Sequence, residues 1–227
     1  EPMSRHTTFR TGGSADILVT PKAEQIGEIL ALCKKEQIPW TVIGNGSNLL
    51  VGDGGIRGVV LEIGKQMSEI SIEGTTITAG AGAMLSAIAS KAAAQELTGL
   101  EFASGIPGSL GGAVVMNAGA YGGEMKDVLT EVTVLTPEGT FLTLPLAELD
   151  LSYRHSIIPE RGYLVVSAVL ELHPGKAEEI RAIMDDLKEK RVSKQPLEYP
   201  SAGSTFKRPE GYFAGKLIQD AGLRGFQ

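Results

Sequence analysis

Cysteine is nearly absent from this chain of 227 residues, since Cys33 is the single example. One cysteine excludes an internal disulfide, and its place in an apolar helical stripe predicts a small buried hydrophobe rather than a reactive thiol. Histidine is also scarce, and 3 scattered histidines with one cysteine supply no set of metal ligands. We therefore expect neither a disulfide framework nor a metal centre.

Long apolar runs and a basic excess are missing as well. No run approaches the roughly 18 apolar residues that a membrane span requires, and we expect no signal peptide. The formal net charge is -6 with both signs interspersed, so no basic stripe is available to neutralise a phosphate backbone. We expect no nucleic-acid partner and no membrane anchor, and we expect a cytoplasmic monomer that can bury a sizeable core.

Glycine, by contrast, is abundant, with 29 residues. They gather at 44–58, 80–82, 105–123 and 203–225, which are places where the backbone must turn sharply or approach a ligand. Glu1 is not an initiator methionine and no stop signal precedes Gln227. We expect the chain to be a fragment.

Apolar periodicity predicts a mixture of helices and strands. Strands 16–19 and 41–43, with the helix between them, are expected to form a βαβ unit with parallel pairing, and 59–63 is expected to begin a second set of strands. We place domain boundaries near Gly64 and His173. The expected helices are 21–37, 83–96 and 177–190, and the expected strands are 16–19, 41–43, 59–63, 69–72, 76–79, 131–135, 140–144 and 163–172. We expect one hairpin to turn at Glu73-Gly74 and a second at Pro137-Glu138-Gly139.

The string Gly44-Asn45-Gly46-Ser47-Asn48 directly follows an apolar strand. A glycine loop there presents backbone N–H groups to an anion such as a pyrophosphate. It is not the Rossmann fingerprint, because Leu49 occupies the position of the third glycine, a strand-like segment follows, and no helix start is expected to face the loop. No Gly-Lys-Ser/Thr follows, so Walker A is excluded too. An ordinary tight turn is the alternative.

A second glycine-rich string spans residues 105–122. Its glycines, its one proline and the small residues around Asn117 would let the backbone pack flat against a planar ligand. The alternative is a flexible loop, although linkers do not contain Ile, Leu, Val and Met at this density.

Tyr153 and Arg154 join an aromatic ring to a permanent charge. A guanidinium forks onto a carboxylate, so Arg154 can hold an acidic substrate and stabilise negative charge that develops on it. A surface salt bridge is the alternative for Arg154. The neighbouring His155 is expected to be a structural histidine rather than a base.

The string from Tyr199 to Pro209 places Ser204 on a glycine turn close to Lys207 and Arg208. Nearby cations would stabilise the alkoxide left behind, so Ser204 could donate a proton. No Gly-x-Ser-x-Gly elbow exists, which disfavours a serine hydrolase. A plain turn with a capping serine remains the alternative.

In their order and spacing, these four strings resemble the UDP-N-acetylenolpyruvoylglucosamine reductase family. The resemblance runs from Thr7–Gly13 to Ala214–Leu223. The absence of an extra tyrosine-bearing loop between the Arg154 strand and the Ser204 string favours its type II branch. It implies a fold of the α+β class, with a two-part, PCMH-like FAD-binding module followed by a partial substrate-binding domain. The implied parts are 1–64, 65–172 and 173–227.

The same resemblance implies non-covalent FAD, with the pyrophosphate on the Gly44–Asn48 loop. It implies that NADPH reduces the flavin and that hydride then passes from flavin N5 to C3 of the enolpyruvyl group of the UDP-sugar, giving UDP-N-acetylmuramate. Arg154 matches the catalytic arginine, Ser204 matches the serine that protonates C2, and Tyr153 and Arg208 match substrate contacts. The other implied FAD contacts are Ile106, Pro107, Gly108, Ser109, Gly112, Ala113, Asn117 and Gly119.

Three expectations qualify this resemblance. The family's C-terminal catalytic glutamate has no match in the chain, so we expect severely reduced turnover from these residues alone. A flavin oxidase or dehydrogenase with the same module and another substrate is an alternative, because fold does not fix function. A nucleotide-binding or regulatory module that kept the cleft and lost the chemistry is a second alternative.

Overall fold

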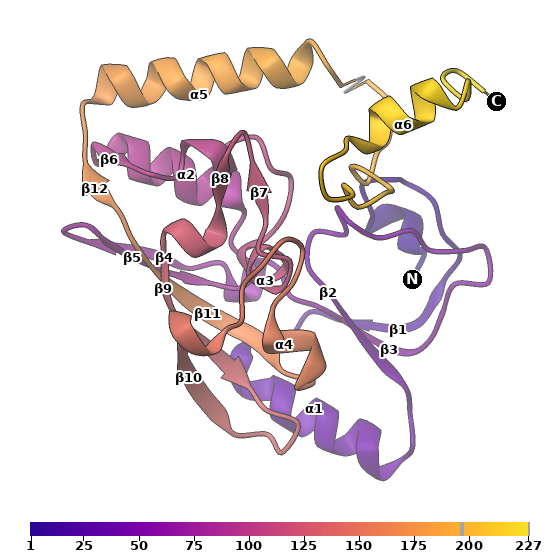
Figure 1. Ribbon diagram of the computed structural model, residues 1–227. Helices are drawn as coiled ribbons and strands as arrows, with labels where there is room; N and C mark the ends of the chain where they lie inside the picture. The colour runs from indigo at the N-terminus through magenta and orange to yellow at the C-terminus, as the bar shows by residue number, and fades with distance from the viewer. Residues whose placement is uncertain (196–197, 227) are drawn as a thin grey trace.

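The computed structural model describes residues 1–195 and 198–226 (Figure 1). Residues 196–197 and 227, which fall within the predicted 173–227 domain, lie outside the described residues. The described chain forms a three-stranded sheet and a five-stranded sheet, together with two small pairs of strands. Among the described residues, no helix combines the length and the apolar character that crossing a membrane would need.

The first sheet is parallel and has the strand order β1-β3-β2. The predicted direct pairing of β1 with β2 is wrong, because β3 lies between them. The prediction that residues 59–63 begin a second strand set is wrong for the same reason. Val60 and Leu61 are consecutive and fully buried, which is the pattern of a central strand covered on both faces. The elements are β1 (Ala15–Val19), α1 (Ala23–Lys35), β2 (Trp40–Ile43) and β3 (Ile56–Glu62).

Helix α1 connects β1 to β2 and packs through Ile26 and Cys33. Cys33 is buried, which confirms the expectation from its apolar stripe. Gln37 has a φ of +55° just beyond the helix, and the N–H of Ile38 donates to the carbonyl of Cys33 at 2.8 Å. This left-handed residue ends the helix and turns the chain into β2.

The second sheet is antiparallel, with the order β10-β9-β11-β5-β4. The predicted hairpin at Glu73-Gly74 is confirmed by the pairing of Glu73 with Thr76, and the hairpin after Leu135 by the pairing of Leu135 with Phe141. The strands are β4 (Ile70–Glu73), β5 (Thr76–Gly80), β9 (Leu129–Leu135), β10 (Phe141–Pro145) and β11 (Leu164–Glu171).

The glycine-rich string 105–122 contains a short helix that periodicity did not predict. Helix α3 (Leu110–Val115) buries Leu110, Ala113 and Val114 against the second sheet and contacts β11. Two glycines within it, Gly111 and Gly112, weaken the helical signal of so short a segment. Other short elements are α2 (Leu85–Ala94), α4 (Ile157–Glu160), β6 (Leu97–Thr98), β7 (Gly119–Ala120), β8 (Gly123–Glu124), β12 (His173–Pro174), η1 (Met3–Arg5), η2 (Lys65–Met67), η3 (Glu101–Ala103), η4 (Met125–Asp127) and η5 (Leu146–Glu148).

The main hydrophobic core links the two sheets. Leu61 from β3 belongs to the same cluster as the apolar face of the second sheet, whereas Val60 points to a smaller cluster with Met3, Ile43 and Val51. Because side chains alternate along a strand, β3 faces the large core on one side and the N-terminal segment on the other. The first sheet is thereby joined to the second.

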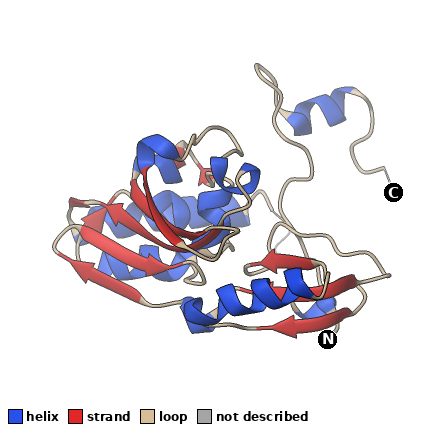
Figure 2. Cartoon of the chain, turned by 90° about the horizontal axis from the view of Figure 1, so that it is seen from below, coloured by secondary structure: helices blue, strands red, loops and turns tan. Residues whose placement is uncertain are grey.

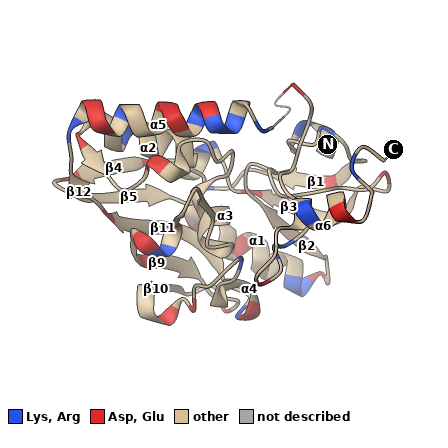
Figure 3. Ribbon diagram, turned by 45° about the horizontal axis from the view of Figure 1, so that its top comes forward, with Lys and Arg blue, Asp and Glu red and all other residues tan. Residues whose placement is uncertain are grey.

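Helix α5 (Ala177–Val192) lies along α2 and η3 and buries Ile180 (Figure 1). Both acidic and basic residues occur along α5, with acidic residues in its first turn and basic residues in its last (Figure 3). The sequence places α5 beyond the predicted domain boundary near His173. In the structure, α5 packs on α2 and η3, which belong to the predicted part 65–172. The described chain then ends in α6 (Ala214–Asp220), which stands off the body at the end of a long loop (Figure 2).

Candidate active site

The two predicted glycine strings lie side by side. The Asn45 amide Nδ2 donates to the carbonyl of Pro107 at 2.7 Å. A Cβ added to Gly44 would lie 2.2 Å from Ser109 Oγ, so the backbones approach closely there. The expectation that no helix start faces the loop is wrong, because α3 begins at Leu110 beside it. Only the fold brings this distant helix to the loop.

The Gly44–Asn48 loop has the donors that an anion needs. Within residues 1–195 and 198–226, the main-chain N–H groups of residues 45–48 donate to no protein acceptor. Gly46 adopts a φ of +59° and its carbonyl accepts the N–H of Thr8 at 3.2 Å, which fixes the loop against the N-terminal segment. Such a set of unpaired N–H groups suits a pyrophosphate, so this loop fits the predicted FAD.

Replacing Gly46 by alanine is expected to distort this loop. A Cβ there would lie 2.0 Å from the carbonyl oxygen of His6, and the positive φ adds strain. We expect the free energy of unfolding to fall by more than about 1 kcal/mol and the purified protein to lose flavin. Thermal unfolding and visible absorption measure the two effects. Gly54→Ala is the matched control, because a Cβ at Gly54 meets nothing within 4 Å; equal effects of both variants would contradict the prediction.

The remaining predicted FAD contacts lie on or near α3. Ser109 precedes α3 and is buried, as is Ala113 within the helix. Ile106 packs against the core from the string before the helix. In such positions these residues can meet a ligand mainly through their backbone. Pro107, Gly108 and Gly112 share this segment, and Gly119 lies in β7.

Asn117 holds the end of this passage together. Its side chain is buried, with Nδ2 donating to Glu124 at 2.8 Å and to the carbonyl of Ser152 at 3.2 Å, while Oδ1 accepts the N–H of Lys126 at 3.0 Å. The amide is therefore engaged within the protein. An FAD contact by Asn117 stays a prediction.

Tyr153 and Arg154 form the tip of a tight turn. Ser152 and His155 exchange two main-chain hydrogen bonds of 3.2 and 3.1 Å, and Arg154 has a φ of +57°. The turn is tied down by buried Ser156, whose Oγ donates to the carbonyl of Val115 at 2.7 Å. A strained non-glycine residue held in this way is typical of a functional site. No sequence signal marks Ser156 as the anchor.

The Arg154 guanidinium lies between its own turn and the β7–β8 hairpin. It sits 5.2 Å from the centre of the Tyr153 ring, and Nη2 donates to the carbonyl of Gly119 at 3.4 Å. A hydrogen bond from Lys126 lowers the pKa of Glu124 against the opposing effect of burial, and the Arg154 charge contributes to the lowering. Glu124 therefore remains ionised near Arg154.

The Ser204 string approaches this turn through Arg208. The N–H of Arg208 donates to the Tyr153 hydroxyl at 3.1 Å, and its guanidinium lies 4.7 Å from the centre of the Phe213 ring. Ser204 is exposed and follows Gly203, which has a φ of +79°. The structure thus brings Tyr153, Arg154 and Arg208 together. The Ser204 hydroxyl makes no hydrogen bond within the described part of the chain.

His155 occupies a peripheral position beside the turn. Its Nε2 lies 3.0 Å from Asp150 and its Nδ1 lies 3.7 Å from Glu160. This environment fits the predicted structural role. Within the described residues, no group of three or more His, Cys, Asp or Glu side chains could hold a metal ion.

His6 lies beneath the Gly44–Asn48 loop and was missed by the sequence analysis. Its Nδ1 lies 2.8 Å from Glu62 and its Nε2 lies 3.2 Å from Glu1. Burial lowers the pKa of His6, but the hydrogen bonds and charges of the two carboxylates outweigh it and raise the pKa above its usual 6.5.

The stability of the protein is expected to depend on the charge of His6. Because the folded-state pKa is raised, the contribution is fully present below pH 6.5 and is lost as the pH rises through the folded-state value. The difference in melting temperature between the unsubstituted protein and His6→Gln, followed between about pH 5.5 and pH 9, should shrink with rising pH. A difference that is constant or grows with pH would contradict this.

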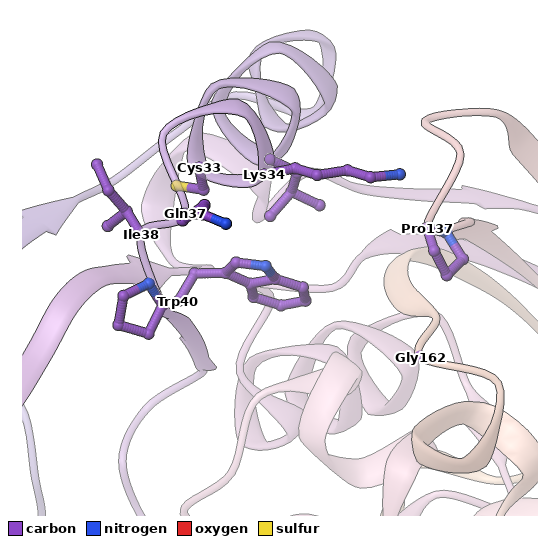
Figure 4. Close-up of a pocket in the computed structure, with 9 residues that line it drawn as sticks. Cys33, Lys34, Gln37, Ile38, Trp40, Pro137 and Gly162 are labelled. Carbon is purple, nitrogen blue, oxygen red and sulfur yellow. The ribbon is translucent and has the colours of Figure 1, made fainter.

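A hollow of about 440 Å³ lies elsewhere, at the opposite end of β2 from the loop. Figure 4 shows the ring of Trp40, which begins β2, between the end of α1 and Pro137. It contains none of the predicted site residues. The candidate site is instead the surface where the Gly44–Asn48 loop, the start of α3 and the Arg154 turn meet.

Comparison with known proteins defines the class of this chain first. The model of an FAD binding domain matches residues 15–145, and cholesterol oxidase from Brevibacterium sterolicum shares the fold at a TM-score of 0.55 and 17% identity, over 74% of this chain and 36% of that one. The chain therefore has the predicted PCMH-like FAD-binding module of flavin-dependent oxidoreductases, and the predicted α+β fold class is confirmed.

The particular family follows from closer relatives. A model described as the C-terminal domain of UDP-N-acetylenolpyruvoylglucosamine reductase matches residues 195–227. The reductase of Agathobacter rectalis is 61% identical over all of this chain and 76% of its own length, and that of Clostridioides difficile is 54% identical over 99% and 74%. The crystal structure of the Thermus caldophilus reductase aligns at a TM-score of 0.84 with 35% identity, over 98% of this chain and 79% of that one. The chain belongs to the UDP-N-acetylenolpyruvoylglucosamine reductase family, which confirms the predicted resemblance.

Proposed function

We propose that this protein, a member of a reductase family of peptidoglycan precursor synthesis, uses NADPH and non-covalent FAD to reduce the enolpyruvyl ether of UDP-N-acetylglucosamine to UDP-N-acetylmuramate. The observation that carries the proposal is that Tyr153, Arg154 and Arg208 lie together. The Tyr153 hydroxyl accepts the N–H of Arg208, and the Tyr153 ring lies beside the Arg154 guanidinium. The absence of an extra tyrosine-bearing loop between the Arg154 strand and the Ser204 string supports membership of the type II branch. We also propose a cytoplasmic monomer that binds neither nucleic acid nor membrane.

The Gly44–Asn48 loop would hold the FAD pyrophosphate through its main-chain N–H groups. Residues 106–109 would present further backbone groups, since the N–H groups of Gly108 and Ser109 also donate to no protein acceptor in the described chain. Bound FAD would supply hydride chemistry, in which a hydride taken from NADPH is passed from N5 to C3 of the enolpyruvyl group.

Arg154 would bind the enolpyruvyl carboxylate. As C3 gains the hydride, the electron pair of the C2–C3 double bond moves to C2 and its carboxylate, and a guanidinium aimed there stabilises the developing charge. The Gly119 carbonyl accepts a hydrogen bond from the guanidinium, and the charge of the Glu124 carboxylate acts on it from nearby. The charge of Arg154 is therefore already in position before the reaction.

Ser204 would complete the reduction by donating its hydroxyl proton to C2. Its O–H bond breaks as the C2–H bond forms, and water then returns a proton to the alkoxide. Lys207 and Arg208, close by in the chain, would stabilise that alkoxide. Hydride at C3 and proton at C2 together account for reduction of the double bond.

The first test is the visible absorption spectrum of the purified protein under anaerobic conditions. A flavin spectrum that bleaches with NADPH and returns when the enolpyruvyl UDP-sugar is added would support the proposal. Because the family's C-terminal glutamate has no match in the chain, we expect this return to be slow. A bleached flavin that returns with oxygen but shows no return at all with the UDP-sugar would favour an oxidase with another substrate. Bound flavin that NADPH does not reduce would favour a module without the chemistry.

A further inference from the structure

The segment that carries Ser204 is held at both of its ends. At one end Ser201 is hydrogen-bonded to Thr8 in the N-terminal segment, and at the other end the N–H of Arg208 donates to the Tyr153 hydroxyl. The first anchor belongs to the part with the parallel sheet and the second to the part with the antiparallel sheet. Ser204 lies between these two anchors.

Thr8 makes three hydrogen bonds that join the two sides of the candidate site. Its N–H donates to the carbonyl of Gly46 at 3.2 Å, and its carbonyl accepts the N–H of Ser201, also at 3.2 Å. Its Oγ1 donates to the carbonyl of Ser201, a residue 193 positions away. Thr8 is therefore hydrogen-bonded both to the Gly44–Asn48 loop, which is proposed to hold the pyrophosphate, and to the turn that leads to Ser204.

The contact continues from Ser201 toward Ser204. Ser201 Oγ accepts the N–H of Gly203 at 3.1 Å, and Gly203 supplies the left-handed turn immediately before Ser204. All three polar main-chain and side-chain groups of Ser201 are thus engaged, two of them by Thr8. The position of Thr8 sets the position from which the Ser204 turn begins.

Thr8 itself belongs to a well-fixed segment. Its neighbour Thr7 is buried and donates through Oγ1 to the carbonyl of Thr11 at 3.1 Å. One residue earlier, His6 is held by Glu62 at the end of β3. Segment 201–213, by contrast, is largely exposed. Because Thr8 lies in a fixed segment and segment 201–213 is exposed, the hydrogen bonds between them position the exposed segment. The exposed segment does not position Thr8.

We propose that Thr8 is a positioning residue that sets Ser204 relative to the Gly44–Asn48 loop, and so relative to the bound flavin. The proposal rests on the proposed function, in which Ser204 is the proton donor. Thr8 then affects the reduction of the UDP-sugar, which needs Ser204, and leaves the reduction of flavin by NADPH unchanged. A merely structural role would affect both half-reactions or neither.

The test is a pair of variants, Thr8→Val and Thr8→Ser, studied by anaerobic stopped-flow absorption. Valine keeps the shape and the main-chain bonds but removes the hydroxyl, so we expect re-oxidation of reduced flavin by the enolpyruvyl UDP-sugar to slow by about 5-fold to 50-fold. Serine keeps the hydroxyl and should stay within about 2-fold of the unsubstituted protein. Flavin content and the rate of reduction by NADPH should not change in either variant.

Thr130→Val is the matched control, because Thr130 also donates its hydroxyl to a main-chain carbonyl, that of Val169, at 3.1 Å on the second sheet. It should leave both half-reactions unchanged. Equal slowing of both half-reactions in Thr8→Val, or loss of its flavin, would overturn the proposal in favour of a role in the loop alone. Normal re-oxidation in Thr8→Val would overturn it as well.

Ser204→Ala separates this inference from the function on which it rests. If Ser204→Ala re-oxidises at the normal rate, the proton-donor role is wrong and the positioning role of Thr8 is overturned with it. If Ser204→Ala is slow and Thr8→Val is normal, only the Thr8 proposal is overturned. The double variant should be no slower than Ser204→Ala, because Thr8 acts through that serine; additional slowing would overturn the proposal.

Discussion

Ser204→Ala is expected to slow the re-oxidation of reduced flavin by the enolpyruvyl UDP-sugar about 10²-fold to 10⁴-fold, which is the usual contribution of a positioned general acid. Alanine removes the proton donor but leaves the turn in place, because the left-handed φ belongs to Gly203 and the anchors belong to Ser201 and Arg208. NADPH should still bleach the flavin, since that step needs no proton from Ser204. Anaerobic stopped-flow absorption measures the two steps separately.

The control for this variant is Ser71→Ala, an exposed serine on β4 remote from the proposed site. It should leave both steps unchanged. Re-oxidation of Ser204→Ala within about 3-fold of the unsubstituted rate would be too small a loss for a general acid. That result would favour an oxidase or dehydrogenase with a different substrate.

The sequence identified most elements but not their arrangement. Periodicity is a local property, so it located α1 and the hairpins, yet it could not show that β3 enters between β1 and β2. The three consecutive apolar residues Val59, Val60 and Leu61 contained that information, because a central parallel strand is buried on both faces. An alternating pattern would have indicated an edge strand or a half-exposed sheet.

The candidate site was predicted unevenly for a similar reason. Glycine strings and a charged turn are visible in sequence, and the structure brings both into one region. The residues that hold these strings in place, Thr8, Ser156 and His6, have no such signal. Their partners are Ser201, Val115 and Glu62, which are remote in sequence, so only the fold reveals the contacts.

Arg154→Met is expected to produce the other large loss. Methionine keeps much of the length of the side chain but removes the charge that would bind the enolpyruvyl carboxylate and stabilise the charge developing at C2. Loss of one such electrostatic group costs about 10²-fold to 10³-fold in kcat, and we expect the KM for the UDP-sugar to rise as well. Reduction of the flavin by NADPH should be much less affected. Steady-state kinetics and stopped-flow absorption measure these effects.

Arg154→Lys separates charge from geometry. Lysine keeps the charge and shares the cost of the φ of +57°, so the turn should be as stable as before, but an ammonium cannot fork onto the carboxylate. We expect a loss between those of the unsubstituted protein and Arg154→Met. Arg181→Met on the exposed face of α5 is the control and should be silent. If Arg154→Met retained both kcat and KM, Arg154 would be a surface ion-pairing residue, and the turn that presents it would need another explanation.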